Sequence, residues 1–61
     1  MKTIEAVQHV LETQGITKYR LAMSLGLAPV SINQYLRGTC MSQATADKFK
    51  QVYGITVTDV R

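Results

Sequence analysis

Residues 16–38 constrain the fold most, because two short helical patterns follow one another there with only a few residues between them. Thr17 is of a type that caps helix amino ends, which predicts a helix beginning at the next residue. Gly26 can supply the positive φ that ends this helix. Pro29 is favoured as the first residue of a second helix, because its missing N–H would have no partner there. With Gly38 closing that helix, the pattern predicts a helix-turn-helix.

Apolar side chains recur at helical spacing in both stretches, so each helix has one face to bury. These faces comprise Leu21, Ala22 and Leu25 in the first helix and Ile32, Tyr35 and Leu36 in the second. Ile16 and Leu27 precede the two helices, and we expect them to pack on Leu21 and Ile32 as hydrophobic staples. Ala28 is a weak cap that forfeits about 1 kcal/mol. Helices this short cannot bury such faces alone, so other helices must cover them.

One further helix is expected on each side of this motif. The first starts after Thr3, runs to about Gln14 and ends at Gly15, with a buried stripe formed by Ile4, Val7, Val10 and Leu11. The other runs from Gln43 to Tyr53 between Ser42 as cap and Gly54, with inward-facing Ala46, Phe49, Val52 and Tyr53.

The last seven residues, ITVTDVR, carry two conflicting signals. The alternation of apolar and polar residues suits a strand, which would permit β pairing between two subunits. Thr56 followed by Asp59 instead resembles a capping box that opens a fifth helix, and we favour that helical turn. Ile55 is expected to close over the end of the preceding helix.

Length and charge describe one small domain with a basic centre. The chain has 61 residues and a formal charge of +3, so residues 1–61 form a single domain with a limited core. Between Thr13 and Ala46 it carries Lys18, Arg20 and Arg37 and no acidic residue. Positive potential is therefore centred on the motif, which suits a polyanionic partner.

Several function classes find no support in the residues. One histidine, His9, and one cysteine, Cys40, provide neither metal-ligand spacing nor a nucleophile and its base. No Gly-rich phosphate loop or acidic pair is present. We therefore expect no enzyme, catalytic residue, metal, cofactor or small-molecule substrate. The unpaired cysteine and the lack of a membrane-spanning run or signal peptide indicate a cytoplasmic protein with no membrane partner.

Residues 16–38 resemble the phage Cro and cI-type repressor family without a gap. The matching residues are Thr17, Leu21, Ala22, Gly26, Leu27, Ile32 and Gly38. The resemblance implies an all-α, lambda-repressor-like domain of four to five helices, with its helix-turn-helix motif at residues 17–38. It also implies a transcriptional regulator that acts as a homodimer and represses from a near-palindromic operator in double-stranded DNA. Its setting would be the bacterial cytoplasm or nucleoid, in a phage, a prophage or a host.

A helix that reads DNA must place side chains from its exposed amino-terminal half against base edges in the major groove. Here those residues are Pro29, Val30, Asn33 and Gln34. Asn and Gln can each pair bidentately with adenine, which discriminates by about 1–3 kcal/mol. Val30 can pack on a thymine methyl, whereas Pro29 offers only shape. The family often has polar residues at these two positions, so the chain departs from it there.

Phosphate contacts are expected around the same helix, from Thr17, Lys18, Tyr19, Ser31, Arg37 and Thr39. Lys18 stands where the family frequently has Gln, beside backbone N–H groups that favour anions. Arg37 and Thr39 lie in the loop that touches phosphate in related repressors. Ordinary solvated surface is the competing interpretation of every such side chain.

The competing function is a protein-interaction module, such as an antitoxin-type protein, with weak or no specific DNA binding. The apolar Pro29 and Val30 favour that alternative. For a homodimer, the candidate surfaces are residues 55–60 and the apolar residues near Leu36 and Met41.

Overall fold

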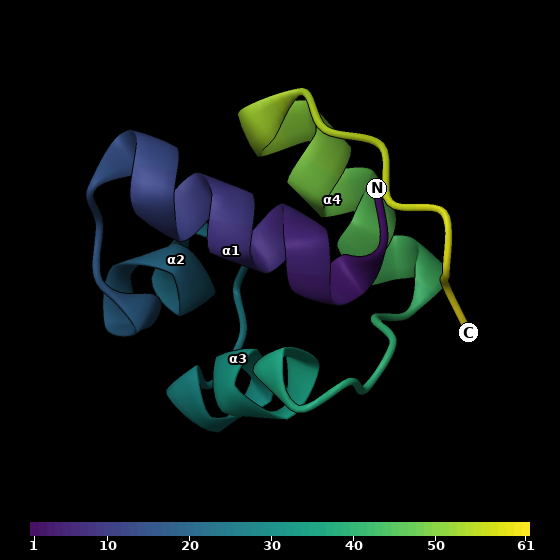
Figure 1. The fold of residues 1–61 in the computed structure, drawn as a ribbon, viewed down its shortest axis with the longest axis horizontal. Coiled ribbons are helices and arrows are strands. Elements are labelled where there is room, and N and C mark those ends of the chain that lie inside the picture. Colours follow the sequence, from purple (N-terminus) through teal and green to yellow (C-terminus); the bar gives the residue numbers. More distant parts are fainter.

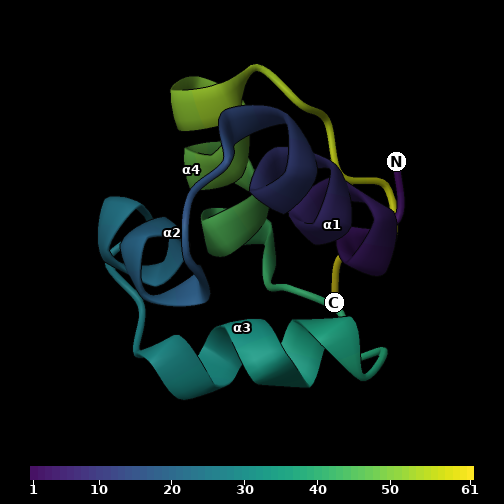
Figure 2. The same cartoon turned by 60° about the vertical axis from the view of Figure 1, so that its left-hand side comes forward.

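The computed structural model describes all of residues 1–61 as four α-helices with no strand, which confirms the all-α prediction (Figure 1). The helices are α1 (Thr3–Gln14), α2 (Lys18–Ser24), α3 (Pro29–Leu36) and α4 (Gln43–Tyr53). In both views α3 lies along one side of the molecule, and the carboxyl end of α4 lies on the opposite side, with α1 between them (Figure 2). No helix combines the length and the apolar character that crossing a membrane would need.

The predicted starts of α2, α3 and α4 are confirmed, whereas α1 begins at Thr3 itself and not after it, with Lys2 at the N-cap position. Thr17 Oγ1 accepts the backbone N–H of Arg20 at 3.1 Å, and Ser42 Oγ accepts that of Thr45 at 3.3 Å. Ala28 makes no side-chain cap, as its type predicts. Local sequence therefore sets where the helices around the predicted motif begin and end.

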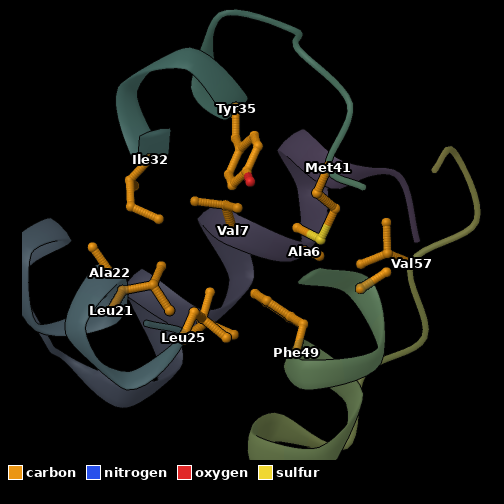
Figure 3. Close-up of a cluster of buried hydrophobic side chains, with 12 residues drawn as sticks. Ala6, Val7, Leu21, Ala22, Leu25, Ile32, Tyr35, Met41, Phe49 and Val57 are labelled. Carbon is orange, nitrogen blue, oxygen red and sulfur yellow. The ribbon is translucent and has the colours of Figure 1, made fainter. Parts of the chain in front are cut away.

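One apolar core joins all four helices (Figure 3). Its twelve residues are Ala6, Val7, Val10, Leu21, Ala22, Leu25, Ile32, Tyr35, Met41, Ala46, Phe49 and Val57. Ile16 and Leu27 are half-buried against it, where the expected staples place them. The tilted rings of Phe49 and Tyr53, 5.2 Å apart, extend the core along α4.

Two predicted buried faces need correction. On α1, Ile4 and Leu11 are only half-buried, whereas Thr3 and Ala6 are buried. The buried stripe is therefore rotated toward the smaller side chains of Thr3 and Ala6. On α4, Val52 is 45% exposed, because the apolar arc of that helix is wider than the surface that the core covers.

The carboxyl-terminal segment is neither the predicted fifth helix nor a strand, because it follows an irregular path past the amino end of α1. Asp59 does not close a local capping box with Thr56. Its Oδ1 atom instead accepts the Thr3 backbone N–H at 2.6 Å and the Thr3 hydroxyl at 2.7 Å. The favoured prediction is wrong because a distant partner, Thr3 at the start of α1, competes for the carboxylate with two donors. We call these Thr3–Asp59 hydrogen bonds the terminal clasp.

Asp59 in the terminal clasp and the neighbouring Cys40 both have shifted pKa values. Hydrogen bonds from Thr3 hold the pKa of Asp59 below its ordinary value, because they stabilise the ionised carboxylate. Cys40 donates its thiol to Asp59 Oδ2 at 3.6 Å. Burial and the neighbouring carboxylate both raise the pKa of this thiol, which disfavours the reactive thiolate.

The segments suggested as a dimer surface are largely used by the chain itself. Met41 and Val57 belong to the core, so the expectation of exposed apolar side chains around Met41 is wrong. Leu36, Ile55 and Val60 are half-buried against that core. Part of their apolar area is therefore used in packing within the chain.

We expect Asp59→Asn to weaken the dependence of stability on acid pH. The folded-state pKa of Asp59 is lowered. Its contribution to folding stability is therefore complete above the unfolded-state pKa of about 3.9, and it is lost as pH falls through the folded-state pKa. Urea unfolding from neutral to strongly acid pH should show a shallower loss of stability in the variant. Asp47→Asn is the control, because it removes an exposed carboxylate outside the clasp. Equal losses in Asp59→Asn and the natural protein would contradict this role.

Candidate functional site

The exposed face of α3 carries all four of the predicted base-contacting residues. Pro29, Val30, Asn33 and Gln34 are all exposed. The opposite face is anchored, because Ile32 is completely buried and Tyr35 is 5% exposed. Helical spacing separates the two sets, so packing of one face orients the other outward.

The turn between α2 and α3 is built from backbone hydrogen bonds that end α2 sharply. The Gly26 N–H donates to the Met23 carbonyl at 3.2 Å, and the Leu27 N–H donates to the Ala22 carbonyl at 2.9 Å. This pair forms a Schellman motif, in which Gly26 adopts a φ of +70°. The turn sets the direction in which the chain enters α3.

A second Schellman motif ends α3 and places the following loop. The Gly38 N–H donates to the Tyr35 carbonyl at 3.1 Å, and the Thr39 N–H donates to the Gln34 carbonyl at 3.1 Å. The motif leaves Arg37 and Thr39 exposed beside the carboxyl end of α3. Two of the predicted phosphate-contacting residues therefore flank that helix end.

The remaining predicted phosphate-contacting residues lie at the starts of α2 and α3. Thr17, Lys18 and Tyr19 are exposed, whereas Ser31 is only half-exposed. The Thr17 oxygen accepts the cap bond from Arg20, and its hydroxyl hydrogen is left to donate elsewhere. Lys18, Arg20 and Arg37 are exposed cations on or next to α2 and α3, where the chain has no acidic residue.

One hydrogen bond that the sequence did not predict joins α2 to α3. Lys18 Nζ donates to Asn33 Oδ1 at 3.3 Å. The partners are 15 residues apart, so the contact depends on the angle between α2 and α3, for which no local pattern provides a signal. The bond thus joins Lys18, a predicted phosphate-contacting residue, to Asn33, a predicted base-contacting residue.

Comparison with family models, curated proteins and solved structures found no match to this chain. The surface contains no pocket, and no group of three or more potential metal ligands gathers on it. The candidate site is thus a convex surface made by α3, its two ends and the start of α2.

We expect Gly26→Ala to destabilise the protein by about 1 kcal/mol, because the φ of +70° is strained for a residue with a Cβ. A Cβ here meets no atom within 4 Å, so the cost is conformational and not steric. Gly26→Asn is the matched variant, and we expect a smaller loss because Asn tolerates this conformation better. Thermal unfolding measures both. An unchanged stability in Gly26→Ala would contradict a strained turn.

Proposed function

We propose that this protein is a sequence-specific, double-stranded DNA-binding transcriptional regulator of the Cro type, with a lambda-repressor-like helix-turn-helix formed by α2 and α3. The observation that carries the proposal is the surface of α3. Its exposed face presents hydrogen-bonding and apolar side chains without a negative charge, and cations flank it. A helix of this kind fits the major groove, where each base pair has a distinct pattern.

In this proposal the exposed side chains of α3 divide into two kinds of base contact. Asn33 and Gln34 form hydrogen bonds to base edges, while Val30 packs on a thymine methyl and Pro29 contributes shape. Their exposure supports this assignment, because none is occupied by core packing. Base contacts then confer sequence preference.

Phosphate contacts would hold α3 in register along the groove. Lys18, Arg37 and Thr39 supply donors on two sides of the helix, with Thr17, Tyr19 and Ser31 near them in sequence. Such contacts raise affinity for every sequence and make it sensitive to salt. We further propose a homodimer on a near-palindromic operator, since one short helix reads too few bases. Occupation of that operator would repress transcription in the bacterial cytoplasm or nucleoid.

A second candidate function is binding to a protein partner. Tyr19, Met23 and Val30 are 63%, 58% and 59% exposed, so three of the five large exposed apolar side chains lie on α2 and α3. Apolar side chains grouped on one part of a surface are typical of interaction sites. The two candidates predict different effects of changing Gln34 and Arg37. Specific DNA binding requires both side chains, whereas binding to a protein partner does not.

The test is a selection from random duplexes, followed by anisotropy titrations of the enriched and a scrambled site at two salt concentrations. We expect a preference of about a thousandfold or more and a two-fold symmetric site. Gln34→Ala should reduce the preference at one position per half-site. Arg37→Met should weaken binding to both duplexes and lower the salt slope by about 1 per protomer.

Lys50→Met provides the matched control, because it removes a cation from the last turn of α4, on the side of the molecule away from α3. We expect this variant to keep both the preference and most of the affinity. Equal binding to all duplexes would exclude a specific regulator. Absence of binding would favour the protein-interaction module.

A further inference from the structure

The hydrogen bond between Lys18 and Asn33 determines which atoms the outer face of α3 can offer a base. Nζ of Lys18 donates to Oδ1 of Asn33, so one of the two lone pairs of the amide oxygen is occupied and a positive charge lies beside the other. The amide NH₂ group carries two donors that this contact does not use. The ammonium keeps two further donors after giving one to Asn33. Together the pair presents mainly donors and a positive charge.

We propose that the Lys18–Asn33 pair reads guanine, and that Lys18 sets this preference. One of its two remaining donors faces the base, and the other is left for the phosphate contact proposed above. The inference rests on the proposed DNA binding and specifies the base at one position. Guanine exposes two acceptors in the major groove, O6 and N7, which complement a surface of donors. Adenine exposes one acceptor and the N6 amino donor, and that donor would face the ammonium.

The surroundings of the pair keep this donor character intact. Lys18 and Asn33 are both exposed, so their free donors are accessible from outside. No acidic residue occurs between residues 13 and 46, so no carboxylate of α2, α3 or the turn neutralises the ammonium. Because Lys18 bonds to Asn33 and not to Gln34, the neighbouring amide retains the acceptor and donor that adenine pairing needs.

One variant locates the base position, and two variants of Lys18 test the role of its charge. Asn33→Ala identifies the base position, because selection from random duplexes should lose its preference there alone. At that position we expect guanine for the natural protein and also for Lys18→Arg, which keeps the charge and the donors. Lys18→Met keeps the side-chain length but removes the charge and the hydrogen bond to Oδ1 of Asn33. It should shift the ratio of guanine to adenine about tenfold toward adenine.

Arg20→Met is the matched control, because it removes an equal charge from α2 without breaking the bond to Asn33. It should keep guanine at this position. Adenine in the natural protein, guanine retained by Lys18→Met, or no position that depends on Asn33 would each overturn the inference while leaving DNA binding in place. Enrichment of no duplex by the natural protein would instead refute the proposed function, and this inference with it. Circular dichroism of each variant verifies that the fold is unchanged.

Discussion

None of the four helices can be stable alone, since the longest has 12 residues and isolated helices of that length are marginal in water. Each therefore depends on the apolar side chains that it shares with the others. Leu21, Ile32 and Phe49 come from three different helices and are all completely buried. A chain of this size has a total stability of only about 3–9 kcal/mol, so losing one such side chain threatens every element at once.

The candidate site depends on the same shared core. α3 has one buried and one exposed face, so the contacts that hold Ile32 and Tyr35 also aim Asn33 and Gln34 outward. The glycine turns at its two ends fix its entry and exit with backbone bonds. The backbone of α3 is already helical, which limits the entropic cost of binding to the ordering of its exposed side chains.

Local chemistry explains what could be predicted from the sequence. Thr17, Gly26 and Pro29 act through atoms a few residues away, so their helix ends are confirmed, and so is the exposure of the α3 side chains. Asp59 has equally local signals, but its carboxylate accepts hydrogen bonds from Thr3, which is 56 residues away in the sequence. The Lys18–Asn33 bond was missed for the same reason, since a distance across two helices has no sequence periodicity.

The terminal clasp joins residues that are 56 positions apart, so it closes almost the entire chain into a loop. Closing a loop of that length carries an entropic cost that local helix caps avoid. The Thr58 N–H also donates to the Met1 carbonyl at 2.8 Å, so the same closure ties down both ends. We therefore expect fraying of the first turn of α1 and release of the final segment to occur together.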